Sequence, residues 1–164
     1  MPFIRERTHR LPLAYYRGPV VVSFTACIKD RAHAFEDVDV IAQFRHDLAD
    51  ALQKNVCCAP IYCFMPDHLH ILVSGLSENA DTWRAMVAFK QKTGFWFSRH
   101  RPSFAWQKDF HDHILRKDDD LAAHVRYIAD NPVRKRLVAR WNDYPHTGAL
   151  GIELKVVLAD TATL

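Results

Sequence analysis

The sequence predicts an α+β protein, built on a ferredoxin-like βαββαβ antiparallel sheet with an added helix towards the C-terminus. Three observations predict it: short β-branched or apolar runs alternate with helical periodicity, the segment order is strand, helix, strand, strand, helix, strand, helix, and 164 residues suit one domain. We expect a single domain over residues 20–147, preceded by a basic arm over 1–19 and followed by an extension over 148–164.

The first four elements follow from the spacing of apolar side chains. Residues 20–25 are β-branched and aromatic, which is typical of a strand. Over residues 38–54 the apolar side chains recur at three- and four-residue intervals, which predicts a helix. Residues 59–64 and 69–73 are short apolar runs on either side of the turn-forming segment 65–67, so they predict two neighbouring strands.

The second half of the chain continues the alternation. A second helix is expected over residues 79–99, and residues 104–115 have the pattern of an extended segment. Three acidic residues at 118–120 suit the N-terminus of a helix over 121–130, where carboxylates complement the helix dipole. Pro132 predicts that this helix ends near Asn131.

Composition limits the environment and the partners. The net charge of +3 permits a nucleic-acid partner without requiring one. The cysteines form no Cys-x-x-Cys pair, so we expect buried, reduced thiols. No signal-peptide pattern and no apolar run of about 18 residues is present, so we expect a cytoplasmic protein without membrane contact.

Two pairs of histidines are candidates for metal binding. His68 and His70 lie two apart on an expected strand, so both imidazoles would project from one face and Leu69 from the other. From spacing alone, two histidines without a ligand remain the alternative. Hydrolases of the histidine-triad type need a third alternating histidine, and Leu72 stands there. His111 and His113 form a second pair with a polar centre, which could bind a metal or orient a catalytic group.

A tyrosine on the third helix offers a nucleophile. Tyr127 and Asn131 are four residues apart, so they would lie on one helix face about a turn apart. A phenol attacks phosphorus well only when the phosphate is polarised, which a divalent ion can do. Two imidazoles and one amide oxygen would leave positions for phosphate oxygens on Mg²⁺ or Mn²⁺. The alternatives are a half-buried tyrosine with a hydrogen bond and an asparagine that ends a helix.

Three segments together resemble a known family. They are Met-Pro-Asp-His-Leu-His-Ile-Leu-Val at 65–73, Trp-Gln-Lys-Asp-Phe-His-Asp-His-Ile-Leu-Arg at 106–116 and Tyr-Ile-Ala-Asp-Asn-Pro-Val-Arg at 127–134. In this order and spacing, over about residues 15–147, the chain resembles the single-tyrosine HUH transposases (IS200-like), especially the REP-associated tyrosine transposases.

The resemblance implies an HUH domain that cuts and joins single-stranded or hairpin DNA through a 5′-phosphotyrosine. It assigns the metal to His68 and His70 and the nucleophile to Tyr127. Asn131 stands where relatives use glutamine or asparagine as a third ligand. Because asparagine is shorter than glutamine, His111, His113 or a water could replace it. Relatives act as monomers or as dimers that exchange tyrosine helices, and the sequence leaves both open.

Basic residues near the tyrosine predict a DNA surface. We expect contacts to DNA from residues around the third helix: Arg116, Arg126, Arg134, Lys135 and Arg136. Arg5, Arg7 and Arg10 could add a basic arm. A second cluster over residues 90–101 mixes basic and aromatic side chains, which could bind DNA or belong to the core. A catalytically silent hairpin-binding module is the alternative function, and a phosphoesterase for small nucleotides, which would not need Tyr127, is a third.

Overall fold

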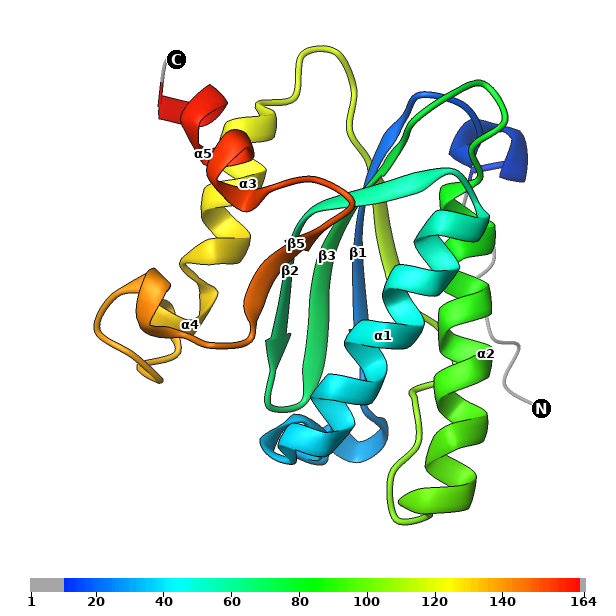
Figure 1. Ribbon diagram of the computed structural model, residues 1–164, viewed down its shortest axis with the longest axis vertical. Coiled ribbons are helices and arrows are strands. Elements are labelled where there is room, and N and C mark those ends of the chain that lie inside the picture. The colour runs from blue at the N-terminus through cyan, green and yellow to red at the C-terminus, as the bar shows by residue number, and fades with distance from the viewer. Residues whose placement is uncertain (1–10, 163–164) are drawn as a thin grey trace, which may run out of the picture.

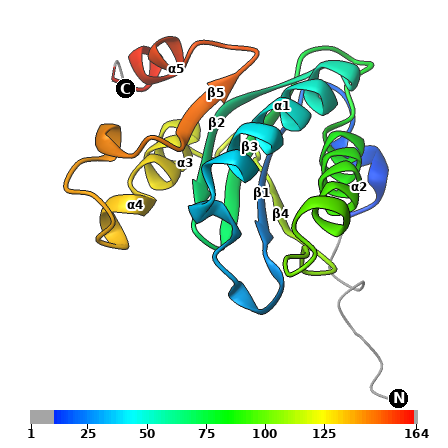
Figure 2. The ribbon, with the colours of Figure 1, turned by 60° about the horizontal axis from the view of Figure 1, so that its bottom comes forward.

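The computed structural model describes residues 11–162, and their centre is a five-stranded antiparallel sheet with strand order β4-β1-β3-β2-β5. Helices cover both faces (Figures 1 and 2): α1 and α2 lie on one side, and α3, α4 and α5 lie on the other. The strands are β1 (Val21–Cys27), β2 (Cys57–Met65), β3 (His68–Gly75), β4 (His111–Ile114) and β5 (Thr147–Leu150). The helices are α1 (Val38–Lys54), α2 (Thr82–His100), α3 (Leu121–Ala129), α4 (Asn131–Arg134) and α5 (Leu154–Ala162).

The expected βαββαβ order is confirmed. Strands β1 to β4 with α1 and α2 form that unit, and α1 has the bounds that its apolar spacing predicts. Asp37 begins α1 because its carboxylate accepts a hydrogen bond from the Asp39 amide at 2.9 Å. The same carboxylate pairs with Arg101 at the end of α2, at 2.9 Å, so one residue ties the ends of both helices together.

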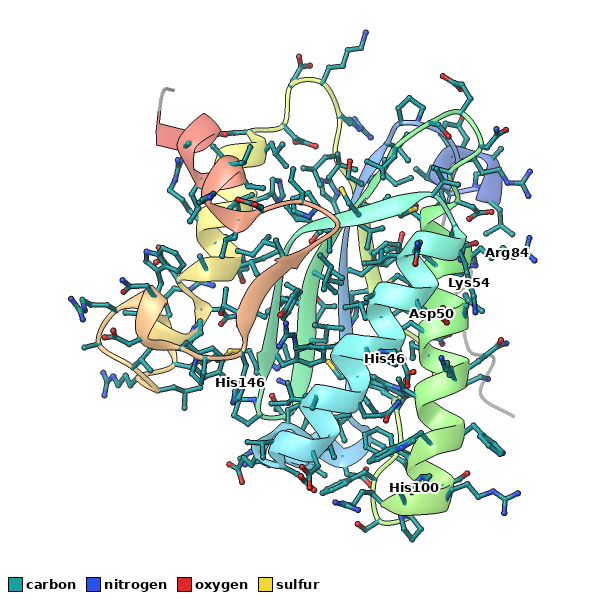
Figure 3. The ribbon with its side chains drawn as sticks, viewed as in Figure 1. His46, Asp50, Lys54, Arg84, His100 and His146 are labelled. Carbon is teal, nitrogen blue, oxygen red and sulfur yellow. The ribbon has the colours of Figure 1, made fainter. Side chains whose placement is uncertain are left out.

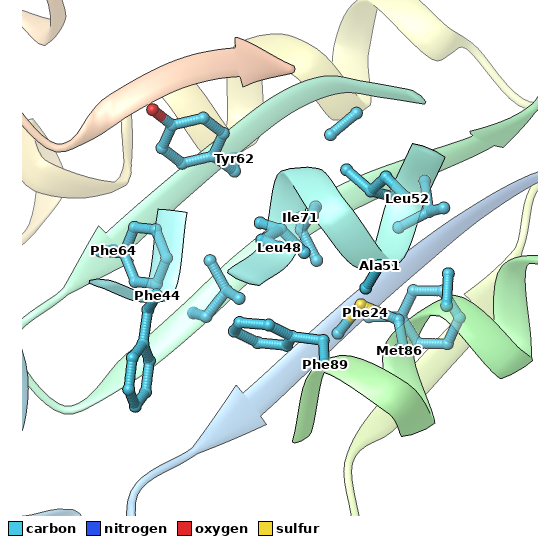
Figure 4. Close-up of a cluster of buried hydrophobic side chains, with 14 of the residues drawn as sticks. Phe24, Phe44, Leu48, Ala51, Leu52, Tyr62, Phe64, Ile71, Met86 and Phe89 are labelled. Carbon is cyan, nitrogen blue, oxygen red and sulfur yellow. The ribbon is translucent and has the colours of Figure 1, made fainter. Parts of the chain in front are cut away.

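The larger core lies between the sheet and the pair α1 and α2 (Figure 4). Phe44 and Leu48 of α1 and Phe89 of α2 pack on Phe24 and Ile71 of the sheet, and all five are fully buried. Burial of this kind is the main favourable term in folding. It fixes the position of β3, the strand that carries His68 and His70.

A smaller core lies on the opposite face of the sheet. Val125 and Ile128 of α3 and Val157 of α5 pack against a patch on β2 and β3 that includes Ile61 and Leu72. The contacting residues of α3 recur at the spacing of one helix face. This packing holds α3 over the strands.

Two features of the structure differ from the expected pattern, and a third agrees with it. Of the extended segment 104–115 only His111–Ile114 is a strand. The tyrosine helix is not the last helix, because α4, β5 and α5 follow it. Helix α3 ends at Ala129, so the helix end predicted near Asn131 is confirmed, and Pro132 lies in the first turn of the separate short helix α4.

The second basic-aromatic cluster stabilises the packing of α1 on α2. Phe97 is fully buried, and Lys92 lies 2.9 Å from Asp47 and 3.3 Å from Asp50, both on α1. Figure 3 labels Asp50 and Lys54 on α1, which form an ion pair at 2.9 Å, and Arg84 at the start of α2. The core alternative is therefore the better interpretation of Phe97 and Lys92, whereas Phe95 is 64% exposed and has the Arg99 guanidinium 5.2 Å from its ring centroid.

Two further expectations can be compared with the described residues. Arg5, Arg7 and Arg10 lie outside them, whereas Tyr16, later in the expected arm, is buried and donates a hydrogen bond to Asp112. Among residues 11–162 no helix combines the length and the apolar character needed to cross a membrane.

Candidate functional site

The hairpin between β2 and β3 positions the histidine pair. Only Pro66 and Asp67 separate the two strands, and their carbonyl oxygens accept hydrogen bonds from the Phe35 and Ile28 amides at 3.0 and 2.9 Å. His68 is therefore the first residue of β3, and His70 follows on the same face. The two imidazole centroids are 4.6 Å apart and the rings are perpendicular, while Leu69 is buried in the larger core. The predicted shared face is confirmed.

Each imidazole is held by a second side chain through its Nδ1 atom. His68 Nδ1 lies 2.6 Å from Asp67 Oδ1, and because a carboxylate only accepts hydrogen bonds, Nδ1–H is the donor. His70 Nδ1 lies 2.9 Å from the Thr25 hydroxyl on the neighbouring strand. The Nδ1–H of His68 leaves its Nε2 lone pair free to bind a ligand, and so does the tautomer of His70 that donates from Nδ1 to the Thr25 hydroxyl. Both partners fix the ring orientation.

Burial keeps both imidazoles neutral near pH 7. Desolvation lowers the pKa of His68, opposed by the Asp67 carboxylate, and lowers the pKa of His70 to about 4. The cations Arg31, Arg134 and Lys135 act in the same direction on one or both rings. Neutral imidazoles are the form that binds metal ions, so the donor set fits a divalent ion.

Asn131 is the remaining candidate ligand, and it lies at the junction of α3 and α4. Asn131 as a residue is 4% exposed, and its side-chain amide makes no hydrogen bond to the other described residues, while its polar atoms keep some access to solvent. An amide oxygen that no protein donor occupies is available as a ligand for a cation. The residues present therefore fit a site made of two imidazoles and one amide oxygen.

Helix α3 brings Tyr127 to the histidines. Asp120 caps α3 by accepting a hydrogen bond from the Ala123 amide at 3.0 Å. Tyr127 is 53% exposed, and its ring centroid lies 6.2 Å from that of His70. The Arg134 guanidinium lies 3.8 Å from the tyrosine ring centroid, and its Nη2 donates to the Tyr127 carbonyl oxygen at 3.2 Å. The Arg134 side chain on α4 therefore stacks on the tyrosine ring and limits its movement.

A groove runs beside these residues between the sheet and α3. It has a volume of about 470 Å³ and is lined by side chains of β1, β3, β4 and α3, among them Thr25, His70, His113, His124 and Tyr127. The five expected DNA contacts, Arg116, Arg126, Arg134, Lys135 and Arg136, are all exposed in the segment from the end of β4 to just beyond α4. The site therefore combines two neutral imidazoles, a solvent-accessible phenol and nearby exposed basic side chains.

The second histidine pair lies apart from the first. His111 and His113 are on β4, which is separated from β3 by β1. Because neighbouring strands are about 4.8 Å apart, β4 is about 10 Å from β3. His113 interacts instead with Asp119, at 3.3 Å from Nε2 to Oδ2. This separation disfavours either residue as a ligand of an ion held by His68 and His70.

Three residues of the site were not singled out from the sequence. Asp67 and Thr25 orient the imidazoles, and Arg31 lies 2.8 Å from the Asp67 carboxylate. A signal existed for Asp67, because a carboxylate directly before a candidate ligand can orient it. Thr25 and Arg31 are brought in by strand pairing and a loop after β1, which no local pattern specifies.

Comparison with known proteins identifies a family. The profile of the family described as "Transposase IS200 like" matches residues 20–131, which is more than half of the chain. A relative in Haemophilus influenzae, whose name assigns it provisionally to the REP-associated tyrosine transposases, is 31% identical over 76% of this chain and 76% of its own.

A solved structure shares the fold. It is described as a REP-associated tyrosine transposase bound to a REP hairpin, and it superposes with a TM-score of 0.71. The alignment covers 85% of this chain and 80% of the other, at 20% sequence identity. The match confirms the expected α+β architecture over most of the described residues.

Proposed function

Because this chain belongs to the IS200-like transposase family, with a REP-associated tyrosine transposase among its relatives, we propose that it cuts and rejoins single-stranded DNA by means of Tyr127. The substrate we propose is DNA associated with REP-like hairpins, met in the cytoplasm. The observation that carries the proposal is the approach of Tyr127 on α3 to His70 on β3, with ring centroids 6.2 Å apart.

His68, His70 and Asn131 would hold Mg²⁺ or Mn²⁺. When bound, this ion would supply Lewis-acid polarisation of the scissile phosphate. The protein contributes neutral imidazoles fixed by Asp67 and Thr25, so little side-chain entropy is lost on binding.

Tyr127 then acts as the nucleophile. Its phenolic oxygen forms a bond to phosphorus, the bond between phosphorus and the 3′ oxygen breaks, and the phenolic proton passes through solvent to the leaving 3′ oxygen. Arg134 holds the ring at 3.8 Å and adds positive charge where the phenolate develops.

The joining step reverses the cleavage. A 3′-hydroxyl attacks the phosphotyrosine, a new phosphodiester forms and Tyr127 is released as the phenol. The covalent intermediate conserves the energy of the broken bond, so no nucleotide hydrolysis is required. This agrees with the lack of a Gly-x-x-x-x-Gly-Lys phosphate loop in the sequence.

The basic residues beside α3 and α4 would bind the phosphates of the strand. Arg116, Arg126, Lys135 and Arg136 are exposed, and Arg126 pairs only loosely with Asp120, at 3.7 Å. Such contacts give affinity without reading sequence. Tyr127 and His70 meet within one chain, which supports a monomer with its own tyrosine in place over an exchanged helix.

The test is a covalent adduct assay. The protein is incubated with Mg²⁺ or Mn²⁺ and end-labelled single-stranded DNA that carries hairpins from repeats of its own genome, and the products are separated under denaturing conditions. We expect a shifted band that resists denaturation for the natural protein and none for Tyr127→Phe, which keeps the ring and its stacking on Arg134. Tyr144→Phe is the control: Tyr144 lies just before β5, its hydroxyl donates to the Phe64 carbonyl oxygen at 2.6 Å, and the variant should form the band.

The same assay separates the alternatives. If Tyr127→Phe forms the adduct as well as the natural protein does, the proposed nucleophile is wrong. Hairpin binding with no adduct under any condition would favour the catalytically silent binding module.

A further inference from the structure

A second group of metal-binding side chains lies in the same groove, on the side of β4. His113 of β4, Asp119 of the following loop and His124 of α3 each offer one ligand atom, and these atoms lie within 4.8 Å of one another. The imidazoles of His113 and His124 are nearly parallel, with centroids 5.8 Å apart and an interplanar angle of 20°. His113 and His124 both line the groove that contains Tyr127.

The separations suit one ion. Two ligands bound to a tetrahedral ion at about 2.0–2.1 Å are roughly 3.3 Å apart, from the geometry of a tetrahedron. His113 Nε2 and Asp119 Oδ2 already stand at 3.3 Å. The third ligand atom, on His124, lies within 4.8 Å of the other two, so it would have to move by at most about 1.5 Å to reach the tetrahedral spacing.

The backbone holds each ligand in place. Asp119 lies in a tight turn in which its amide donates to the Arg116 carbonyl at 3.0 Å and its carboxylate accepts from the Arg116 amide at 2.7 Å. His113 is paired with Ser23 in the sheet, and His124 lies in the capped first turn of α3. The three ligands come from three segments, so an ion would join them.

The donor set selects the kind of ion. Two imidazoles and one carboxylate favour a borderline-soft transition metal such as Zn²⁺, whereas Mg²⁺ prefers oxygen ligands and keeps its water. With three protein ligands, a fourth position would face the groove. The cluster is about 10 Å across the sheet from β3, so an ion there would be distinct from one held by His68 and His70.

We propose that His113, Asp119 and His124 form a second divalent-metal site of the zinc class, which fastens the start of α3 to the edge strand β4. His124 and Tyr127 are three residues apart on α3 and therefore lie on the same side of the helix. A bound ion would limit the motion of α3 relative to the sheet. The site does not depend on the proposed DNA chemistry, because metal binding alone defines it.

The experiment counts bound metal on the full chain. The protein is dialysed against Zn²⁺, and separately against Co²⁺, and the bound metal is measured for four forms: natural, His68→Ala/His70→Ala, His113→Gln/His124→Gln, and the combination of all four substitutions. We expect two, one, one and zero equivalents. In the His68→Ala/His70→Ala form, Zn²⁺ should also raise Tm, and Co²⁺ should give the absorption of a tetrahedral site.

A matched control and a milder variant complete the test. His111→Gln changes a histidine of the same strand outside the cluster, so it should leave the number of bound zinc ions unchanged. Asp119→Asn, added to His68→Ala/His70→Ala, should lower the affinity for the one zinc ion that this form still binds. The proposal is overturned if His68→Ala/His70→Ala binds no zinc, or if His113→Gln/His124→Gln binds as much zinc as the natural protein. Loss of DNA cleavage alone would not bear on it.

Discussion

Asp67 orients the imidazole of His68, the first of the two proposed metal ligands on β3. Its carboxylate accepts from His68 Nδ1 at 2.6 Å and is itself paired with Arg31 at 2.8 Å. The ring is therefore oriented before any ion arrives, and its basicity is raised by the negative partner.

Asp67→Asn should lower the affinity of the site for its metal ion. An amide keeps an acceptor for Nδ1–H but loses the charge, and loss of such a partner typically costs about 10- to 100-fold in metal affinity. The concentration of Mn²⁺ that gives half-maximal adduct formation measures it. Asp30→Asn, a nearby exposed carboxylate in the loop after β1, is the control and should leave that concentration unchanged. An unchanged value for Asp67→Asn would contradict the role of the carboxylate.

Arg134→Ala should slow adduct formation at saturating DNA. The guanidinium is 3.8 Å from the Tyr127 ring centroid, and a contact of this kind contributes about 0.5–2 kcal/mol, so we expect a loss of roughly tenfold. Arg136→Ala, two residues further on, should weaken DNA binding without changing the rate at saturation. If Arg134→Ala, like Arg136→Ala, leaves the rate at saturating DNA unchanged, Arg134 contributes only to DNA binding and its proposed effect on Tyr127 is wrong.

At the scale of elements, the ends of α1 and α2 depend on one carboxylate. Asp37 caps α1 and pairs with Arg101 at the end of α2. The hydrogen bond with Arg101 is the main cause that lowers the pKa of Asp37 below its usual 3.8. The ionised Asp37 carboxylate therefore contributes its full stabilisation above about pH 4, the range of its pKa in the unfolded chain. This stabilisation is lost as the pH falls through the lower pKa of the folded state.

Asp37→Ala should reduce the free energy of unfolding by about 1 kcal/mol at pH 7, the usual loss for a helix cap. Asp37→Asn keeps a capping oxygen and should lose less. Urea unfolding at several pH values measures both, and the gap between the natural protein and Asp37→Ala should close below about pH 4. A gap that persists at pH 2 would contradict the assignment.

The elements with strong local patterns were predictable, and those defined by tertiary contacts were not. Residues 38–54 were expected as a helix and are one, because seven buried side chains repeat along one face. Strand β5 has no such pattern: Gly148 is there because a Cβ would lie 2.6 Å from the Tyr62 hydroxyl, a contact visible only in the folded sheet. Helix α5 did carry a signal, since Leu154, Val157 and Leu158 have helical spacing and pack in the smaller core.

For the site, the sequence predicted the shared face of His68 and His70, but not what surrounds it. Alternation along one strand is a local property, so the pair could be anticipated. The partners Thr25 and Asp119 and the approach of α3 to the sheet depend on long-range pairing. The catalytic and ligand roles of Tyr127, Asn131 and the histidines remain predictions.

At the scale of the molecule, the proposed binding of DNA depends on where basic residues gather. The net charge is only +3, so the proposed binding would depend on a local cluster of basic residues. The expected cluster lies in the segment around α3 and α4, on the side of the sheet opposite to α1 and α2 (Figure 2).

Substitution of Lys135 and Arg136 by glutamine should make DNA binding less sensitive to salt. For single strands the slope of log K against log salt changes by about 0.7 for each phosphate that the protein no longer neutralises. Lys54→Gln/Arg84→Gln removes the same charge from the α1 and α2 side (Figure 3) and should leave the slope unchanged. If log K against log salt has the same slope for both double variants, the DNA does not bind at the surface around Lys135 and Arg136. The measurement is the affinity for hairpin DNA at several salt concentrations between about 50 and 200 mM, where the dependence of affinity on salt is large.

The central claim is that Tyr127 becomes covalently joined to DNA, and peptide mapping tests it most directly. The adduct formed with hairpin DNA would be digested with nuclease and protease, and the modified peptide sequenced by tandem mass spectrometry. We predict a nucleotide attached through its 5′-phosphate to the oxygen of Tyr127. Attachment at Tyr144, at another residue, or through a 3′-phosphate would contradict the account.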